Sequence, residues 1–299
     1  MGPGLSRDGG QVSGVGTRRL IVTADDFGRD VAVNEAVEEA HRGGILGSAS
    51  LMVAAPAAAD AVARARLLPA LRVGLHLVLV DGTSVLPPRD IPLLVDADGR
   101  FDDHQGRAGM RFFLAPGIRA QLAAEIRAQF EAFRATGLTL DHVNAHKHMH
   151  LHPTVARLVV AIGRDYGLRA VRLPAEPAAV LRRALPGERQ RAPAYAPAIA
   201  ALRRRLRRAG LAMNDHAFGI AWSGRLVEAR ILDLLPHLPA GVSELYCHPA
   251  TRSTPALAAM MPGYRHAEEL AALMSPAVRR RIAELGIELV SYGDLLPAG

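Results

Sequence analysis

The chain is poor in cysteine and in aromatic residues, and it has no long apolar run. Its 299 residues include one cysteine, Cys247, which excludes an intramolecular disulfide framework and a metal site built from several thiolates. Aromatic residues make up 4% of the chain, so the core must be built mainly from Leu, Val, Ile and Ala. No segment approaches the ~20 apolar residues that a membrane-spanning helix needs. Any metal must therefore be bound by histidine and carboxylate side chains.

Lysine is nearly absent as well, since Lys147 is the only one, and arginine supplies the basic character. The formal net charge is +7, and residues 178–210 alone hold nine arginines against one glutamate. A general nucleic-acid-binding protein would spread its basic residues more widely and place aromatic residues among them. We therefore expect no nucleic-acid partner, and the arginine-dense segment needs a local explanation.

The first residues are predicted to form a loose tail. Residues 1–18 are rich in glycine and lack the apolar stretch of a secretory signal. With 49% hydrophobic and 22% charged residues, the whole chain has the composition of a soluble globular protein. We expect a disordered tail over 1–18, one domain over 19–299, and a cytoplasmic location.

After this tail, short β-branched runs alternate with longer helical stretches. Strands are expected at 20–24, 50–53, 72–80, 139–144, 170–173, 244–247 and 287–290, and helices at 31–41, 57–67, 121–135 and 154–166. This alternation is typical of parallel βαβ units, and seven or eight of them favour an α/β, TIM-barrel-like (β/α) barrel. Residues 81–116 and 174–215 interrupt the pattern and are predicted as long loop insertions.

Two adjacent carboxylates, Asp25 and Asp26, lie at the end of the first predicted strand, in the sequence TADDFG. Catalytic groups gather at the carboxyl ends of barrel strands. Both carboxylates can face one site only where the strand ends, and Gly28 permits a bend there. A carboxylate bound to a metal beside a second one that is free as a base would suit hydrolysis. A role in capping the next helix is the alternative for such a pair.

Histidine is concentrated in one short segment, since five of the twelve histidines fall within 141–153. Pro153 favours an extended conformation at the residue before it. The alternating histidines are then predicted to share one face of an extended chain: His146, His148, His150 and His152. The spacing indicates a divalent-metal site without showing which histidine binds. A solvated loop that binds metal only adventitiously is the alternative.

Three further strands carry polar groups. His76, in the strand VGLHL, is either a metal ligand or a hydrogen-bonded core residue. His248, in ELYCHP, could act as a general acid, stabilise an oxyanion or be structural. Arg172 could orient a substrate or pair with a carboxylate.

One carboxylate and two imidazoles leave coordination positions open for water and substrate, as hydrolytic zinc sites require. The same ligand set binds iron in non-haem oxygenases. The second carboxylate favours hydrolysis, because water activation needs a base and oxygen activation does not.

The motifs TADDFG with Asn34, GLHL, NAHKHMHLHP, RLPAE and ELYCHP stand in the order seen in YdjC-like carbohydrate deacetylases. The chain resembles this family from about Arg19 to its end, and within it the hopanoid-biosynthesis-associated deacetylases (HpnK) most. The resemblance implies a TIM-barrel-like fold and metal-dependent removal of N-acetyl groups from amino sugars.

By position, the resemblance implies metal ligation by Asp26, His76 and His146, with Asp25 as the base and His248 as the acid. Arg172 is expected to bind substrate. The metal is expected to be Zn²⁺ or Mg²⁺. Many relatives have Asp-Ser-His where this chain has Asn144-Ala145-His146, and Asn144 cannot supply a carboxylate to orient a ligand.

The expected substrate is an N-acetylated amino sugar, and the subfamily resemblance implies an N-acetylglucosaminyl hopanoid lipid. A chitooligosaccharide is the alternative within the same chemistry. A non-haem iron oxygenase and a non-catalytic protein that binds metal or lipid are the alternatives from other classes.

The arginine-dense segment ends in a predicted amphipathic helix over 198–213. Its apolar face is formed by Ile199, Leu202, Leu206 and Met213, and five arginines crowd the remainder: Arg203, Arg204, Arg205, Arg207 and Arg208. Such a helix can lie on an anionic membrane with its apolar face partly immersed. It can equally pack on the barrel with a solvated arginine face. The first alternative predicts peripheral contact with the inner face of the membrane.

Overall fold

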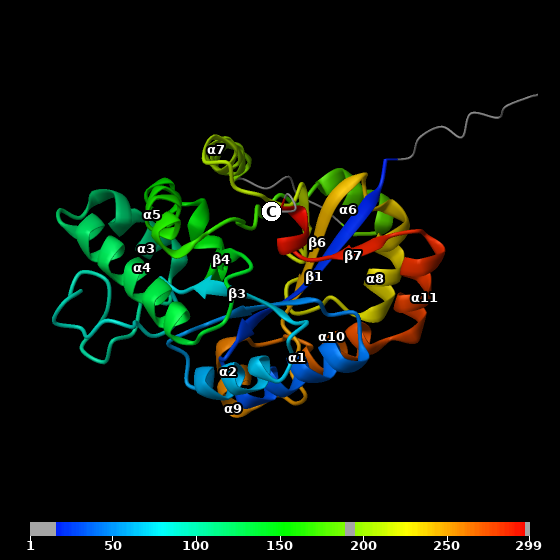
Figure 1. Ribbon diagram of the computed structural model, residues 1–299, viewed down its shortest axis with the longest axis horizontal. Coiled ribbons are helices and arrows are strands. Elements are labelled where there is room, and N and C mark those ends of the chain that lie inside the picture. Colours follow the sequence, from blue (N-terminus) through cyan, green and yellow to red (C-terminus); the bar gives the residue numbers. More distant parts are fainter. Residues whose placement is uncertain (1–15, 189–194, 297–299) are drawn as a thin grey trace, which may run out of the picture.

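The computed structural model describes residues 16–188 and 195–296, and seven parallel strands form its sheet (Figure 1). The strand order is β4-β3-β2-β1-β6-β5, and β7 pairs with the first half of β1. Parallel bridges from Val143 to Val171 and from Ala170 to Ala212 continue the pairing beyond β4. The strands are β1 (Arg18–Phe27), β2 (Ser48–Leu51), β3 (Arg72–Leu77), β4 (Val143–Ala145), β5 (His216–Phe218), β6 (Gly241–Cys247) and β7 (Glu288–Val290). This curled parallel sheet confirms the predicted TIM-barrel-like (β/α) fold.

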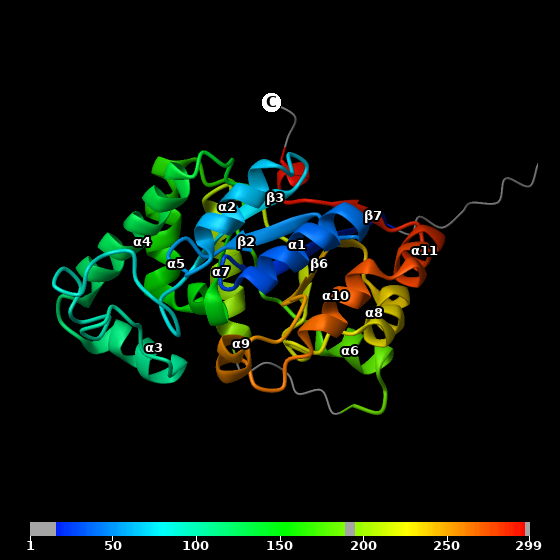
Figure 2. The same cartoon turned by 90° about the horizontal axis from the view of Figure 1, so that it is seen from below.

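Helices cover the outside of the curled sheet. In Figures 1 and 2, α4 and α5 lie on one flank, α8 and α11 on the other, and α1 lies beside α10. The α-helices are α1 (Val31–Gly43), α2 (Ala58–Arg66), α3 (Gln105–Leu114), α4 (Ile118–Ala135), α5 (Pro153–Gly163), α6 (Ala178–Ala184), α7 (Ala196–Arg208), α8 (Glu228–Leu234), α9 (Pro255–Met260), α10 (His266–Met274) and α11 (Pro276–Glu284). Short 3₁₀ helices are η1 (His146–Leu151), η2 (Arg164–Tyr166), η3 (Leu235–His237) and η4 (Gly293–Leu295).

Strand β1 is central because it pairs with β2, β6 and β7. Its side chains alternate between the two faces of the sheet. Leu20 and Val22 belong to the large core that includes the helices, whereas Ile21 packs with Tyr292 on the inner face. On this inner face Thr23 donates a hydrogen bond of 2.7 Å to Glu244. The alternation therefore carries Asp25 to the polar interior, at the carboxyl end of the strand.

Several predicted boundaries differ from the structure. β2 and β4 are displaced by a few residues, and 170–173 contributes isolated bridges in place of a strand. The two insertions contain helices α3, α6 and α7, and strand β5 was not predicted. Of the predicted tail only 16–18 lies within the described residues, and Arg18 already begins β1. The errors fall at short strands because their ends depend on pairing partners, which a sequence pattern does not contain.

The predicted extended chain through the histidine-rich segment is wrong. Residues His146–Leu151 form η1, and Lys147 and His148 adopt φ values of 49° and 54°, in the left-handed region. Only His152 is extended as predicted, with φ −66° and ψ 126°. The physical reason is that Pro153 restricts the residue directly before it and no further. Because the chain coils, the histidines cannot share one face.

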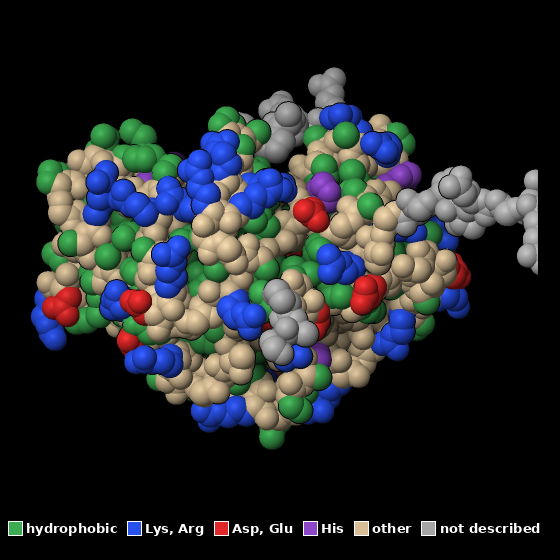
Figure 3. Space-filling model, turned by 45° about the horizontal axis from the view of Figure 1, so that its top comes forward, with side chains coloured by type: hydrophobic (Ala, Val, Ile, Leu, Met, Phe, Trp, Pro, Cys, Tyr) green, Lys and Arg blue, Asp and Glu red, His purple; other side chains and the backbone are tan. Residues whose placement is uncertain are grey.

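The predicted helix over 198–213 is α7, which ends at Arg208. Its apolar residues Ile199, Leu202 and Leu206 are buried in the main core, and α7 contacts α5. Of the two alternatives for this helix, packing on the barrel is therefore confirmed and the partly immersed apolar face is wrong, because the protein itself covers that face. The arginines remain on the outside, and Figure 3 shows Lys and Arg side chains gathered over this region. Within the described residues, no helix is long and apolar enough to cross a membrane.

Candidate metal centre

The end of β1 is irregular, and this irregularity brings two carboxylates to one site. The pairing register between β1 and β2 shifts after Ala24, and Asp26 has a φ of 63°. Asp25 and Asp26 consequently both lie near His76, with closest nitrogen–oxygen distances of 3.9 and 3.4 Å. The alternative that one of them caps the next helix does not hold, because Asp30 caps α1.

Asp26, His76 and His146 form a buried cluster in which one potential ligand atom from each lies within 4.8 Å of the others. His76 Nε2 lies 3.4 Å and His146 Nδ1 3.2 Å from Asp26 Oδ1. Among the described residues this buried carboxylate oxygen has no hydrogen-bond partner of good geometry. A buried charged oxygen without such a partner is costly, and a cation bound between these three groups would satisfy it. The residues therefore fit a divalent metal.

Asn144 joins the cluster to Asp25. Its side-chain oxygen lies 2.7 Å from His76 Nδ1, and its amide nitrogen donates to Asp25 Oδ1 at 2.9 Å. The chain lacks a carboxylate at this position, yet the amide oxygen can accept the hydrogen bond that orients a metal-binding imidazole.

Arg172 lies behind Asp25 and is completely buried. It donates to Asp25 Oδ2 at 2.5 Å and to Glu244 Oε2 at 2.8 Å. Burial by itself would raise the pKa of Asp25, but the Arg172 guanidinium outweighs it and holds the pKa below its ordinary value. Arg172 thus shows the carboxylate pairing that was the alternative to substrate binding, and its side chain has no surface left for a substrate.

Three residues missed by sequence reasoning surround His146 on the outer side. Arg29 Nη1 lies 3.3 Å from both Asp26 Oδ2 and His146 Nε2. Asp81 Oδ2 lies 3.5 Å from His146 Nε2 and 2.8 Å from Lys147 Nζ. Arg29 directly follows the TADDFG motif, and this position is the one feature of the sequence that could have placed it at the site. Asp81 and Lys147 reach the site through left-handed backbone conformations, which no sequence motif predicted.

These charges shift the pKa values of the cluster. Burial opposes ionisation of Asp26, but Arg29 and His146 outweigh it, and the pKa of Asp26 lies well below its ordinary value. Burial also opposes a charged His146, but Asp26 and Asp81 raise its pKa above the usual range. Without a metal, both shifts favour the charged forms of the two side chains, because each charge stabilises the other.

The remaining histidines of the segment do not join the cluster. His148 Nε2 lies 3.1 Å from the Tyr246 hydroxyl, and His150 Nε2 lies 3.0 Å from the Arg172 carbonyl oxygen. His152 caps α5. Of the four alternating histidines, His146 alone lies in the cluster with Asp26.

His248 directly follows β6, and its backbone N–H donates to the buried Glu269 at 2.6 Å. Its ring lies between Tyr246 and Tyr264, with centroid distances of 5.9 and 5.3 Å. The buried Nδ1 has no hydrogen-bond partner among the described residues. Burial lowers the pKa of His248, and the negative charges of Asp26 and Glu269 act against this effect.

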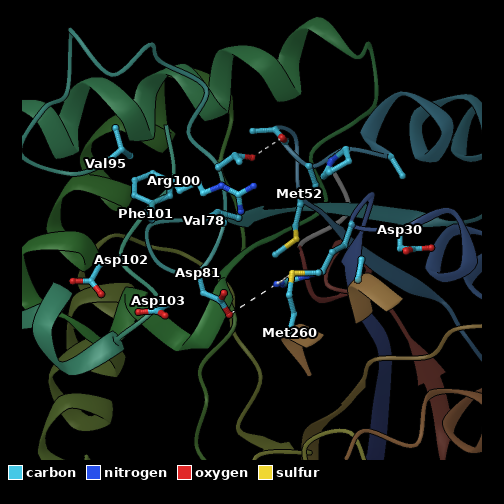
Figure 4. Close-up of a pocket in the computed structure, with 18 of the residues that line it drawn as sticks. Asp30, Met52, Val78, Asp81, Val95, Arg100, Phe101, Asp102, Asp103 and Met260 are labelled. Atoms are coloured by element: carbon cyan, nitrogen blue, oxygen red, sulfur yellow. Dashed lines mark hydrogen bonds and ion pairs between the residues drawn. The ribbon is translucent and has the colours of Figure 1, made fainter. Parts of the chain in front are cut away.

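A cavity of about 1180 Å³ opens next to the cluster, and Arg29 and Asp81 belong to its wall (Figure 4). Figure 4 shows Met52 and Met260 near its centre, and Val78 and Phe101 to their left. Much of the wall is apolar: Met52, Val78, Leu94, Val95, Phe101 and Met260. The Asp26, His76 and His146 cluster thus lies beside a large cavity with a mixed apolar and charged lining.

Known proteins are similar to this chain in sequence and in fold. A family model described as "YdjC-like protein" matches residues 19–284. A carbohydrate deacetylase of Geobacillus stearothermophilus is 32% identical over 278 residues, covering 93% of this chain and 98% of that protein. A carbohydrate deacetylase of Mus musculus is 33% identical over 307 residues and covers 93% and 94%. The crystal structure of an Enterococcus faecalis V583 protein named for cellobiose-phosphate cleavage is similar with a TM-score of 0.74 and 26% identity, covering 93% of this chain and 99% of that one.

Proposed function

This chain belongs to the YdjC-like family, and from that premise we propose that it is a metal-dependent hydrolase that removes the N-acetyl group from an N-acetylated amino sugar. The observation that carries the proposal is the buried Asp26, His76 and His146 cluster with Asp25 beside it. The similarity to carbohydrate deacetylases over more than nine-tenths of the chain supports this substrate class.

Asp26, His76 and His146 would hold the divalent metal, and the two imidazoles suit Zn²⁺ better than Mg²⁺. When bound, the metal polarises the acetamide carbonyl and lowers the pKa of a coordinated water. The protein contributes the arrangement of the ligands and excludes bulk water, since all three side chains are buried.

Asp25 would remove a proton from the attacking water. The hydrogen bonds from Arg172 and Asn144 keep its carboxylate ionised and fixed in orientation. His248 would give a proton to the leaving amine, and its Nδ1 has no hydrogen-bond partner among the described residues. General acid and base catalysis of this kind contributes ~10²–10⁴-fold each.

The group attached to the sugar is a finer part of the proposal. An N-acetylated hexose alone would leave much of the cavity of about 1180 Å³ empty. The apolar wall around Met52, Val78 and Phe101 suits a hydrocarbon aglycone better than a second sugar, whose hydroxyl groups would lack partners there. We therefore propose a lipid-linked substrate, an N-acetylglucosaminyl hopanoid, with a chitooligosaccharide as the second candidate.

A lipid-linked substrate lies in a membrane, so the arginine surface of α7 becomes relevant. Arg204, Arg207 and Arg208 are exposed, and α7 carries no acidic residue that would neutralise them. Each arginine near an anionic surface contributes ~1 kcal/mol. We propose peripheral contact of these arginines with the inner face of the membrane, without insertion of the helix.

An acetate-release assay combined with metal analysis tests the function. The wild-type protein should contain a divalent metal and release acetate from N-acetylated amino sugars, faster from a glycosylated hopanoid than from diacetylchitobiose. Asp26→Ala and His146→Ala should lose both metal and activity. Asp25→Asn is the matched variant at the neighbouring position, and it should keep the metal while kcat falls by ~10²–10⁴-fold.

Each contrary result has a definite meaning. Full metal occupancy with normal turnover in His146→Ala would refute the ligand assignment, and loss of metal in Asp25→Asn would reverse the roles of the two carboxylates. Oxygen consumption without acetate release would indicate an oxygenase, and metal binding without turnover a non-catalytic protein. Liposome binding that is unchanged when Arg204, Arg207 and Arg208 become glutamine would refute the membrane contact.

A further inference from the structure

We propose that Asp141, His142 and Ser50 are positioning residues that act through Asn144 to keep the His76 proton on Nδ1, so that Nε2 faces the metal centre as a free ligand atom. The inference rests on the metal site of the proposed function. Its decisive measurement is made on the metal-free protein, so that the two can fail separately.

The four side chains and His76 form a continuous line of hydrogen bonds through the inside of the barrel. His76 Nδ1 lies 2.7 Å from Asn144 Oδ1, and Asn144 Nδ2 lies 2.9 Å from Ser50 Oγ. Ser50 Oγ lies 3.0 Å from His142 Nε2, and His142 Nδ1 lies 2.9 Å from Asp141 Oδ2. All five side chains belong to buried residues. We call this line the Asp141 relay.

The direction of the hydrogen bonds is fixed at the end near the metal. The Asp25 carboxylate is paired with the Arg172 guanidinium and only accepts hydrogen bonds, so the group of Asn144 that faces it is the NH₂ group. The amide oxygen of Asn144 then faces His76 and can only accept. His76 must therefore carry its proton on Nδ1.

The other end of the line agrees with this direction. The Asp141 carboxylate accepts from His142 Nδ1, and in the tautomer with its proton on Nδ1 the Nε2 atom accepts from the Ser50 hydroxyl. The Ser50 oxygen is then free to accept from Asn144 Nδ2. Both ends of the line are therefore satisfied by the same orientation of the Asn144 amide.

The packing around His142 shows that the fold makes room for this ring. A Cβ atom added at Gly74 would lie 2.5 Å from it, so only glycine fits there. On its other side the ring stacks on Tyr292 with a centroid distance of 4.6 Å. The second oxygen of Asp141 accepts the backbone N–H of Gly293 at 2.9 Å. Both ends of the His142–Asp141 pair are therefore held in place.

The consequence concerns metal binding. If the amide of Asn144 rotated by half a turn, its NH₂ group would face His76 Nδ1 and move the ring proton to Nε2. That nitrogen lies 3.4 Å from Asp26 Oδ1 and 3.4 Å from His146 Nδ1. A proton there would occupy the place of the metal. Ser50 opposes the rotation because its own proton is committed to His142.

The experiment compares Ser50→Ala and His142→Phe with Ser48→Ala. Ser48 is the matched control, because it is a buried serine two residues earlier in the same strand and its hydroxyl has no hydrogen-bond partner among the described residues. The ¹⁵N chemical shifts of the His76 ring in the metal-free proteins report which nitrogen is protonated. Competition with a chromophoric chelator gives the Zn²⁺ affinity, and thermal unfolding shows that each variant is folded.

Wild type and Ser48→Ala should show one tautomer, protonated on Nδ1. Ser50→Ala and His142→Phe should show a mixture, with Zn²⁺ affinity lower by about 10- to 100-fold, and Ser50→Thr should restore both properties. If either of the first two does not fold, Asp141→Asn replaces it, with a mixture of tautomers expected. A pure Nδ1 tautomer in every folded variant, with affinities within about twofold of Ser48→Ala, would overturn the inference. A wild-type protein that binds no Zn²⁺ would refute the metal site, while the tautomers would still decide the relay.

Discussion

Acidification should destabilise this protein partly through one histidine, His150, whose side chain is 1% exposed. Burial, reinforced by the positive charge of Arg172, lowers the pKa of His150 to about 3. Its Nε2 lies 3.0 Å from the Arg172 carbonyl oxygen, and its Nδ1 has no hydrogen-bond partner among the described residues. In the unfolded chain the ring titrates with a pKa of ~6.5. The folded state therefore keeps His150 neutral at a pH where the unfolded state binds a proton.

The sign and size follow from this difference. The contribution of His150 to stability is fully present above pH ~6.5 and is lost as the pH falls towards its pKa in the folded state. Between pH 7 and pH 5, His150 takes up a proton in the unfolded state but not in the folded state. This difference lowers the free energy of unfolding by about 2 kcal/mol. A folded-state pKa one unit higher or lower would change this figure little, because pH 5 lies well above it.

The assay is urea unfolding at pH 7 and pH 5 for wild type, His150→Gln and His237→Gln. The drop in unfolding free energy between the two pH values should be about 2 kcal/mol smaller in His150→Gln than in wild type. Any constant cost of the substitution cancels in this difference. His237 is exposed and serves as the matched control, with the wild-type drop expected. An equal drop in all three proteins would refute the reasoning.

Two further substitutions test the interior and the surface helix. Arg172→Met should lower the unfolding free energy by roughly 3–5 kcal/mol, because it leaves Asp25 and Glu244 as buried charges without their partner; a loss below about 1 kcal/mol in denaturant unfolding would contradict this ion-pair account. Leu206→Ala should cost roughly 2–5 kcal/mol, because Leu206 is completely buried, and a negligible loss in the same assay would mean that the apolar face of α7 does not pack on the core.

The sequence was informative where a motif coincides with the end of a strand. The pair Asp25 and Asp26 was predicted to face one site only at a strand end, and the register shift after Ala24 provides that geometry. The barrel itself followed from the alternation of strands and helices. Both inferences depend on local patterns, which can be identified in the sequence without knowledge of the fold.

The histidine-rich segment was misinterpreted for a reason that applies generally. A spacing of two is compatible with an extended chain, but it does not enforce one. Lys147 and His148 are held in the left-handed region by contacts with distant residues, among them Asp81 and Tyr246. Such conformations cost of order 1 kcal/mol or more and persist only where the surroundings determine them. No local pattern could have predicted them.

Polar residues inside the barrel were also underestimated, because their partners lie far away in the sequence. The sequence leaves Arg172 between substrate binding and pairing with a carboxylate, and the fold surrounds it with Asp25, Glu244 and the ring of Tyr246. Asn144 appeared to weaken the site because it is not a carboxylate. In the structure its amide joins His76 to Asp25, because the oxygen faces the His76 ring and the NH₂ group donates to the Asp25 carboxylate.

The loops around the site depend on buried carboxylates in a similar way. Glu125, in α4, accepts the backbone N–H groups of Val85 and Leu86, and Glu269, in α10, accepts those of Leu226 and His248. Each glutamate ties an otherwise irregular segment to a helix that packs on the sheet. Burial raises the pKa of both glutamates, so these hydrogen bonds are made against a desolvation cost. A protein accepts that cost where backbone N–H groups would otherwise be buried without partners. The segment at Val85 and Leu86 and the backbone at His248 are thereby held by the barrel's own helices, although a glutamate within a helical pattern looks from the sequence like a surface residue.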